Sequence, residues 1–509
     1  MGLEKLFHAS VEKNPQRLAV VFGEQRVTYQ RLQEIINSYA AYLEKNTQAQ
    51  DGIMILAQNS IEQIALILAC FETGRIACPV NWRMSALELA GVMNRGYFQL
   101  GIYDGQCELL YADAENLAER QLPAAKLEAL PRNDPRSGHQ AEQPEDWYAV
   151  RYFTSGSTGV PKSVLHNHRS LMSYARTYSE VSGWTPEDIY ETQSNLFHLS
   201  GFSCIISLFV GGTLVLMDRF REEEFFGAME RERCTRISLV PTLISRCLSS
   251  GAFQKYDFSS VKKIVYGGSP LPMAQVQKTL AVCHCALEQA YGTTETCNIS
   301  VLSGADHERA VAGQIGEKIL QSVGKPIPGV EVRILNEEGV PIDNGIGEVA
   351  VKSPFLLSKV EGNIPKGFDR DGFYMTGDIG HFDENGYLYL IDRKNDMIVS
   401  GGENIYPREV ENCLAHMVND ISTSAVIGVP DPVWGQRVVA FVVRYPNSTI
   451  SEQDVIDFCR EHIASYKKPR EVIFLDRLPM NANRKACRPA LREMYARWHK
   501  GQDQQQENL

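Results

Sequence analysis

The segment from Tyr152 to Val164, YFTSGSTGVPKSV, gathers the residue types that can bind an anion. Its two glycines allow backbone conformations closed to other residues, and its polar side chains supply hydroxyls and one cation. Consecutive backbone N–H groups after a β-strand can form an anion-binding nest. The residues that would act are Thr154, Ser155, Gly156, Ser157, Thr158, Gly159 and Lys162. Composition alone leaves an ordinary Ser/Gly surface turn equally open.

The spacing of this loop separates it from the Walker loop of P-loop nucleotidases. Pro161 occupies the position at which GxxxxGK requires its second glycine. A kinase or NTPase of that class is therefore disfavoured.

The elements that must position the loop alternate between short β runs and helical segments. A strand over 147–153 leads directly into the loop, after a polar connection over 122–146. Upstream, β-like and amphipathic helical patterns alternate over residues 18–43, 53–56, 61–70, 75–80 and beyond 85. Such alternation predicts an α/β domain.

The second half of the chain changes character. Beyond Gly329, runs such as VEVRIL and GEVAVKS alternate apolar and polar residues between glycine turns, which predicts an antiparallel sheet or small barrel. After Asp392 the pattern is again mixed, with the strand-like TSAVIGV and VVAFVVRY and the helix-like EQDVIDFCREHIA, so we expect a separate small domain. The polar ending GQDQQQENL is expected to be a frayed tail.

Composition bounds the kinds of function. At 509 residues the chain suggests about three structural units, at ~150 residues each. The formal net charge of -11, with no basic block, disfavours nucleic acid as a partner. The absence of a signal-like start or a long apolar run favours a cytoplasmic protein without a membrane span. The twelve cysteines lack zinc-site spacing and are interpreted as buried free thiols.

Six motifs follow one another in a specific order. After the loop come LFHLSGF at Leu196, YGGSPLP at Tyr266, AYGTTET at Ala290, YMTGD at Tyr374 and DRKNDMIVSGGENIYPREVE at Asp392. In order and spacing they resemble the acyl-CoA synthetases, a family of adenylate-forming, AMP-binding enzymes, over nearly the whole chain. The resemblance implies a large N-terminal domain, residues 1–394, with two α/β subdomains and a β-barrel-like subdomain, and a small mobile α+β C-terminal domain, residues 395–509.

The reaction implied by the resemblance is that of an AMP-forming acid–thiol ligase. A carboxylate attacks the α-phosphate of ATP, pyrophosphate leaves, and CoA then takes the acyl group. Cations and oriented donors must offset the repulsion between the two anions, and Mg²⁺ can stabilise the leaving pyrophosphate. The expected cofactors are therefore ATP, Mg²⁺ and coenzyme A as co-substrate.

The resemblance assigns roles around the nucleotide. Glu295 would bind the metal, Thr294 would contact the α-phosphate, and Tyr291 would lie against adenine, with Gly292 and Thr293 in the same motif. The base pocket would be lined by Gly267, Gly268 and Ser269. In the later motifs, Asp378 would accept hydrogen bonds from both ribose hydroxyls and Arg393 would add a nucleotide contact.

Two further segments contain histidines. The resemblance implies that His198, in LFHLSGF, lines the acyl pocket rather than acting as an acid or base. His166 and His168 lack a third ligand, so no metal is assigned to them.

The C-terminal motifs are implied to serve the two half-reactions. Lys485 would be the catalytic lysine of adenylation, although Arg484 stands where the family has a flexible glycine and could answer the same charge demand. Asn395, where Asp or Lys is usual, matches the hinge about which the C-terminal domain rotates. Gly401 and Gly402 would line a pantetheine passage.

Three alternatives stay open at this point. The acyl acceptor can be CoA or a carrier-protein phosphopantetheine, and a homodimer is neither required nor opposed. The apolar runs LFHLSGFSCIISLFV and VPTLISRCL fit a fatty or aromatic acid pocket, or equally an ordinary core helix and strand. A non-catalytic nucleotide-binding protein is disfavoured by the joint presence of Lys162, Glu295, Asp378, Arg393 and Lys485.

Overall fold

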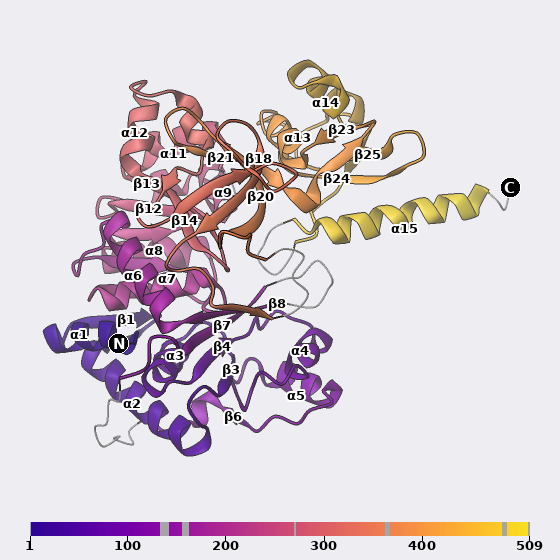
Figure 1. Cartoon of the computed structure of the whole chain (residues 1–509). Coiled ribbons are helices and arrows are strands. Elements are labelled where there is room, and N and C mark those ends of the chain that lie inside the picture. Colours follow the sequence, from indigo (N-terminus) through magenta and orange to yellow (C-terminus); the bar gives the residue numbers. More distant parts are fainter. Residues whose placement is uncertain are drawn as a thin grey trace. The chain divides into compact units, whose positions relative to one another are not determined.

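The computed structural model describes residues 2–132, 142–154, 162–268, 271–361, 367–480 and 486–506, with backbone only at 361, 395 and 500–506. The chain divides into two compact units, which are drawn in Figure 1. Unit 1 comprises residues 1–332, 351–374 and 384–388. Unit 2 comprises residues 333–350, 375–383 and 389–509.

Unit 1 contains a seven-stranded sheet of order β19-β8-β7-β4-β3-β5-β6. Strands β7, β4, β3, β5 and β6 are parallel, and β8 returns antiparallel beside β7. The strands are β3 (Gly52–Leu56), β4 (Ile76–Pro79), β5 (Leu100–Tyr103), β6 (Ala124–Lys126), β7 (Tyr148–Thr154), β8 (Lys162–Asn167) and β19 (Lys359–Glu361). All residues of β3 and β4 are buried, as expected for parallel strands covered on both faces.

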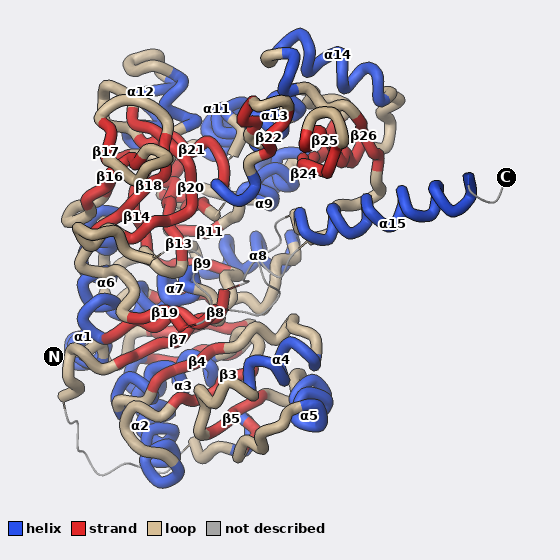
Figure 2. Tube along the Cα trace, turned by 45° about the vertical axis from the view of Figure 1, so that its right-hand side comes forward, coloured by secondary structure: helices blue, strands red, loops and turns tan. Residues whose placement is uncertain are grey.

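Alternate residues of β3 serve two different cores. Ile53 and Ile55 pack with α2 (Tyr29–Asn46) and α3 (Ile61–Thr73), whereas Met54 and Leu56 pack with α4 (Ala86–Met93) and α5 (Glu108–Leu117). Figure 2 shows these helix pairs on opposite sides of the sheet. The central strands of this sheet are thus covered by helices on both faces.

A nine-stranded sheet, of order β15-β14-β13-β12-β11-β9-β10-β1-β2, forms the rest of unit 1. Its strands from β13 to β1 in this order are parallel. Their bounds are β1 (Leu18–Phe22), β2 (Gln25–Thr28), β9 (Ile189–Thr192), β10 (Thr213–Leu216), β11 (Arg236–Ser238), β12 (Lys263–Gly267), β13 (Ala286–Thr293), β14 (Cys297–Leu302) and β15 (Lys325–Pro326).

Helices cover both faces of the nine-stranded sheet. One face packs on α8 (Glu222–Glu232), α9 (Pro241–Ser250), α10 (Ala252–Lys255), α11 (Met273–Cys283) and α12 (Gly304–Val311). The other face shares one core with α1 (Glu4–Lys13), α6 (His168–Ser182), α7 (Leu199–Phe209), α2, α3 and the seven-stranded sheet. The two sheets of unit 1 therefore lie on either side of a common helical layer.

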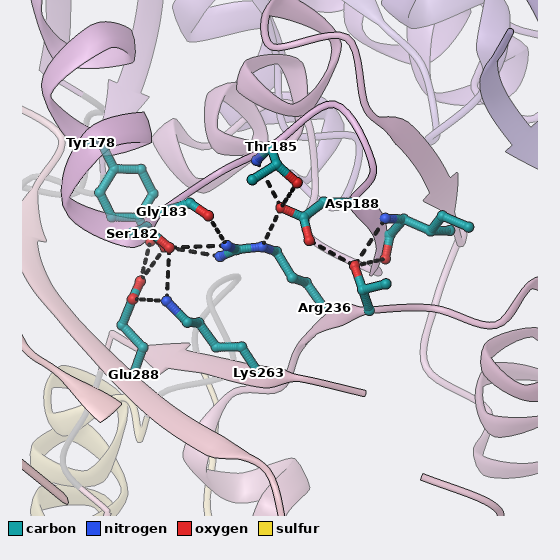
Figure 3. Close-up of polar contacts among 10 residues, drawn as sticks. Tyr178, Ser182, Gly183, Thr185, Asp188, Arg236, Lys263 and Glu288 are labelled. Atoms are coloured by element: carbon teal, nitrogen blue, oxygen red, sulfur yellow. Dashed lines mark hydrogen bonds and ion pairs between the residues drawn. The ribbon is translucent and has the colours of Figure 1, made fainter. Parts of the chain in front are cut away.

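A buried polar network fixes the amino ends of these strands to the end of α6 (Figure 3). Arg236, the first residue of β11, forms an ion pair with Asp188 at 3.0 Å and donates to the Ser182 carbonyl at 2.9 Å. Lys263, the first residue of β12, donates to the same carbonyl at 2.8 Å and pairs with Glu288 of β13 at 2.6 Å. These donors satisfy a helix-terminal carbonyl that has no partner inside α6. Strand β13 is anchored in this way three residues before Tyr291.

Unit 2 contains two sheets. The first has the order β17-β16-β18-β20-β21, with β16 (Glu331–Leu335), β17 (Pro341–Ile342), β18 (Gly347–Lys352), β20 (Tyr374–Phe382) and β21 (Leu388–Arg393). The second has the order β23-β22-β25-β24, with β26 beside β25. Its strands are β22 (Ile398–Ser400), β23 (Glu403–Ile405), β24 (Ile421–Asp431), β25 (Gly435–Arg444) and β26 (Glu471–Phe474). One face packs on α13 (Pro407–Leu414) and α14 (Glu452–His462), the other on α15 (Arg488–Gln506).

The fold class expected from the sequence is confirmed. Both α/β sheets, the β subdomain, seen as a five-stranded sheet, and the small C-terminal α+β part are present. The prediction of a frayed tail is wrong for residues 501–506, because these residues continue α15. The first half of α15 packs through Leu491 and Tyr495. A helix already nucleated by packing extends at little cost into glutamine-rich sequence. The domain boundary at 394/395 stays a prediction.

Two smaller expectations concern cysteines and membranes. All twelve cysteines are free thiols, and all except Cys487 are buried, which confirms the interpretation from the sequence. None of the helices that the structure describes combines the length and the apolar content needed to span a bilayer.

Candidate active site

Most predicted site residues of unit 1 follow the carboxyl ends of parallel strands. Gly267 ends β12, Tyr291 and Thr293 lie at the end of β13, and His198 lies six residues after the last residue of β9. In open α/β sheets, ligands bind in the crevice at this edge. The strand order therefore collects these residues at the binding edge of the nine-stranded sheet.

Gly267 and Gly268 occupy backbone positions that suit glycine. A Cβ on Gly267 would lie 2.5 Å from the Ala290 carbonyl oxygen, and Gly268 has a φ of 80°. Gly267 is paired in register with Ala290, so it lies beside the buried Tyr291. The backbone of Ala290 thus fills the side-chain position at Gly267, whereas a Cβ on Gly268 would meet no atom within 4 Å, so a ligand can approach the bare backbone at Gly268. Ser269 lies outside the described residues.

The turn between β13 and β14 carries Thr294 and Glu295. The Thr293 N–H donates to Thr296 Oγ1 at 3.0 Å inside this turn. A Cβ on Gly292 would lie 1.8 Å from the Cys297 carbonyl oxygen, so the hairpin backbone is closely packed. Thr294 and Glu295 are partly exposed on this fixed turn.

The same turn is held by two hydrogen bonds, one from the seven-stranded sheet and one from the segment before its edge strand β19. His166 Nε2, on β8, lies 2.7 Å from the Thr294 carbonyl oxygen. The Leu357 N–H donates to the Glu295 carbonyl oxygen at 2.8 Å. Neither bond could be predicted from the sequence, because each joins residues far apart along the chain.

The predicted phosphate loop is bounded by paired strand ends. Thr154 ends β7, Lys162 begins β8, and the two are opposite each other in register. Ser155, Gly156, Ser157, Thr158 and Gly159 lie outside the described residues. The hairpin base contains the buried Arg151, which donates to Ser163 Oγ at 2.7 Å and stacks over Tyr97. Arg151 was not predicted as a contributor to this region.

His198 precedes α7 and is half-buried. The loop before it is held by Asn59, which is 3% exposed. Asn59 Nδ2 donates to the Ser194 carbonyl at 2.9 Å, and its Oδ1 accepts from the Leu196 N–H at 3.1 Å. Asn59 was not predicted from the sequence, in which it is one polar residue three positions after the buried strand β3. Much of the apolar run that follows His198 forms α7 and packs in the core.

Unit 2 brings two predicted nucleotide contacts together. Asp378 lies in β20 and is 5% exposed, and Arg393 ends β21. Arg393 Nε lies 2.6 Å from Asp378 Oδ1. This pairing supplies the cation that a nearly buried carboxylate requires.

Ion pairs flank the predicted hinge residue on both sides. Lys394 pairs with Glu348 of β18 at 2.9 Å, and Asp396 pairs with Arg488 of α15 at 2.8 Å. Arg488 also pairs with Glu411 of α13 at 2.9 Å. Asn395, of which only the backbone is described, lies between Lys394 and Asp396 in a short 3₁₀ turn.

The remaining predicted residues lie in the last third of the chain. Gly401 and Gly402 form the turn between β22 and β23 with φ of 62° and 85°. A Cβ on Gly401 would lie 2.8 Å from the Trp434 ring, so the turn is closely approached. Lys485 lies outside the described residues.

Fold and site together define a nucleotide-binding α/β enzyme with a separate C-terminal part. Comparison with known families agrees with this class. Residues 7–359 match the family described as AMP-binding enzyme, and residues 409–485 match the AMP-binding enzyme C-terminal domain. The chain belongs to this adenylate-forming family and is an AMP-forming acid–thiol ligase.

Individual relatives cover nearly the whole chain. The fatty acid acyl-carrier-protein ligase ScoC of Streptomyces coeruleorubidus is 30% identical, over 96% of this chain and 95% of that protein. The long-chain-fatty-acid–CoA ligase FadD13 of Mycobacterium tuberculosis is 31% identical, over 96% and 97%. Among solved structures, o-succinylbenzoate CoA synthetase MenE from Bacillus subtilis, in complex with its acyl-adenylate intermediate, has a TM-score of 0.84 and 29% identity, over 96% and 97%.

Proposed function

We propose that the protein is an acyl-CoA synthetase acting on a fatty or aromatic carboxylic acid. The acid and ATP give acyl-AMP and pyrophosphate, and CoA thiol then gives acyl-CoA and AMP. The observation that carries the proposal is the turn bearing Thr294 and Glu295, which is hydrogen-bonded to the strand that begins with Lys162. One triphosphate can therefore meet groups from both sheets of unit 1.

The proposal gives each part of the site a role in adenylation. The loop from Thr154 to Lys162 binds the leaving pyrophosphate, and Thr294 binds the α-phosphate. Tyr291 and the glycines at Gly267 hold the base, while Asp378 and Arg393 hold the ribose. Lys485 neutralises the reacting carboxylate and α-phosphate.

Glu295 fits the role of magnesium ligand. Its carboxylate is partly exposed on a turn whose backbone is fixed by Leu357, and carboxylate oxygens are preferred ligands of Mg²⁺. When bound, the ion would neutralise charge that develops on pyrophosphate.

The proposed preference for an acid whose acyl part carries no charge rests on the segment over 193–210. It contains no Asp, Glu, Lys or Arg to pair with a charged group on the acyl part. Relatives named as ligases of fatty acids support the fatty half of the proposed substrate class. The aromatic half is supported by the indoleacetate–CoA ligase of Aromatoleum aromaticum, which is 31% identical over 96% of this chain and 97% of that protein.

The acceptor is proposed to be free CoA, approached past Gly401 and Gly402. A carrier-protein phosphopantetheine is the second candidate, favoured by the similarity to ScoC. Both acceptors present the same thiol, so the turn at Gly401 suits either. The proposal places the enzyme in the cytoplasm, where ATP and CoA are available.

A screen of carboxylic acids by pyrophosphate release tests the first step. The panel spans fatty acids of several lengths, aryl acids and amino acids, with ATP and Mg²⁺. We expect release with fatty or aryl acids and none with amino acids. No acid-dependent release from any member would instead indicate a non-catalytic nucleotide-binding protein.

A second measurement separates the acceptors. AMP release is measured in the presence of free CoA and in the presence of holo carrier proteins. The apo form of each carrier protein is the control. Thioester formation with holo carrier protein and none with CoA would reject the proposed acceptor and establish the second candidate.

A further inference from the structure

His166 is a buried histidine at the centre of unit 1 that the proposed mechanism does not use. It lies on β8, four residues after Lys162, and is 0% exposed. Its Nε2 lies 2.7 Å from the carbonyl oxygen of Thr294, a residue 128 positions further along the chain. It therefore connects the strand that follows the phosphate loop to the turn that carries Thr294 and Glu295.

The protonation state of His166 follows from its surroundings. Burial lowers the pKa of the ring to about 4, so the ring is neutral at pH 7. A neutral ring can donate to a carbonyl only from the nitrogen that carries its proton, so Nε2 is the N–H donor. Nδ1 is buried and has no hydrogen-bond partner among the described residues. The bond to Thr294 is thus the hydrogen bond that this ring makes in the described part of the chain.

The position of this bond matters for the site. The carbonyl of Thr294 is held by His166, and the next carbonyl, that of Glu295, is held by the Leu357 N–H. His166 belongs to the seven-stranded sheet, and Leu357 belongs to the segment that leads into its edge strand β19. The turn that they hold joins two strands of the nine-stranded sheet. The two bonds fix consecutive peptide groups, so they fix where the side chains of Thr294 and Glu295 start.

We propose that His166 is a positioning residue for the adenylation half-reaction. By holding the Thr294 carbonyl, it sets the separation between Lys162 and the pair Thr294 and Glu295, so that both act on one triphosphate. The proposal rests on the proposed function, since it assumes that these residues bind ATP. A displacement of about 1 Å at a reacting centre can lower a rate ~100-fold, so one hydrogen bond can control such a step.

His168 provides a matched control in the same chain. It lies two residues after His166, is also 0% exposed, and has a pKa lowered by burial to about 4. Its Nδ1 accepts a hydrogen bond from the Leu3 N–H at 3.1 Å, next to α1. The two histidines share burial and charge state, but only His166 contacts the Thr294 turn.

The test compares His166→Met with His166→Gln, because these side chains have similar length and only Gln retains an N–H donor. Acyl-AMP formation is measured as pyrophosphate release. The measurements give kcat, the KM for ATP and the Mg²⁺ concentration for half-maximal rate. The second half-reaction is followed separately, from preformed acyl-AMP and CoA. His168→Met is measured in parallel, with thermal unfolding of all variants.

We expect H166M to lower kcat for acyl-AMP formation by about 10- to 100-fold and H166Q to recover most of that loss. The rate from preformed acyl-AMP should change less than about threefold in both, which shows that the protein is folded. H168M should lower the unfolding temperature as much as H166M and leave the ratio of the two half-reactions unchanged. If the ratio of the adenylation rate to the thioester-forming rate is the same in H166M, H166Q and H168M, the proposal is overturned.

A folding failure of H166M does not remove the test. His166→Asn then takes its place, because its amide is one methylene shorter than that of Gln and falls short of the Thr294 carbonyl. Equal adenylation by H166N and H166Q would reject the positioning role. The wild-type protein decides the proposed function separately: if it releases no pyrophosphate with any acid, that function fails before the variants are compared.

Discussion

Arg393 Nε and Asp378 Oδ1 lie 2.6 Å apart. This ion pair joins the last residue of YMTGD to the second residue of the DRKND motif, fifteen positions further along the chain. The Asp378 side chain is 7% exposed, whereas the Arg393 side chain is about half exposed. A nearly buried carboxylate is thereby paired with a guanidinium that is still accessible. A charged acceptor of this kind suits two ribose hydroxyls, the role that the sequence assigned to it.

Replacing Asp378 by Asn should weaken nucleotide binding. The amide keeps the shape but loses the charge, and a hydrogen bond to a charged group contributes about 1.5–3 kcal/mol. We expect the KM for ATP to rise about 10- to 100-fold, measured by initial rates of pyrophosphate release. Asp383→Asn, a carboxylate five residues further on, is the control and should leave this KM within twofold. An unchanged KM in D378N would remove Asp378 from the nucleotide site.

Replacing Lys485 by Ala should separate the two half-reactions. The ammonium group is proposed to stabilise charge only while acyl-AMP forms, and loss of one such donor typically lowers kcat ~100- to 1000-fold. Thioester formation from synthetic acyl-AMP and CoA should stay within threefold of wild type. The two steps are measured by pyrophosphate release and by thioester product. Full acyl-AMP formation by K485A would show that another cation, such as Arg484, meets this charge.

Replacing Asn395 by Pro should have the opposite effect. The residues on either side are held by ion pairs, Lys394 to Glu348 and Asp396 to Arg488, so a change of backbone angle is confined to the position between them. Proline fixes φ near −65° and removes one rotatable bond. We expect acyl-AMP formation to persist and thioester formation to fall more than about tenfold, as expected for a blocked conformational step.

Asn395→Ala distinguishes backbone freedom from side-chain chemistry. Alanine lacks the amide but keeps a rotatable φ, so both half-reactions should stay within threefold of wild type. If N395P forms thioester at the wild-type rate, the hinge does not lie at this position.

Stability should fall as the medium is acidified, because unit 1 buries neutral histidines. Burial lowers the pKa of His166, His168 and His307 each to about 4, below the ordinary value near 6.5. Between about pH 6.5 and pH 4 the unfolded chain binds protons that the folded chain does not, so the free energy of unfolding decreases as pH falls. Each histidine should contribute a loss of about 2 kcal/mol between pH 7 and pH 5.

Urea unfolding at pH 7 and pH 5 measures this loss. His307 accepts from Tyr266 Oη at 2.9 Å, so His307→Gln preserves an acceptor while removing one titrating group. H307Q should show a smaller difference between the two pH values than wild type, whereas exposed His416→Gln should show the same difference. Identical differences in H307Q and wild type would contradict the assignment.

Much of the fold could be predicted from local pattern. The strand expected over 147–153 is β7, and the helix expected in EQDVIDFCREHIA is α14. The prediction of a frayed tail was wrong because helix formation is cooperative. Packing at Leu491 and Tyr495 nucleates α15, and the composition of residues 501–506 carries no sign of that packing. The apolar run after His198 could not be assigned to pocket or core, since both require the same residue types.

The sequence by itself determined which groups are available for chemistry: the loop that ends at Lys162, the turn at Thr294 and Glu295, and the pair Asp378 and Arg393. These are local motifs, and a motif is visible wherever spacing along the chain is fixed. Only the tertiary structure decided what holds them in place. The bond from His166 to Thr294 spans 128 residues, and Asn59 holds a loop 135 residues further on. Such contacts depend on how two sheets pack around a shared layer of helices, and packing leaves no fixed spacing in the sequence.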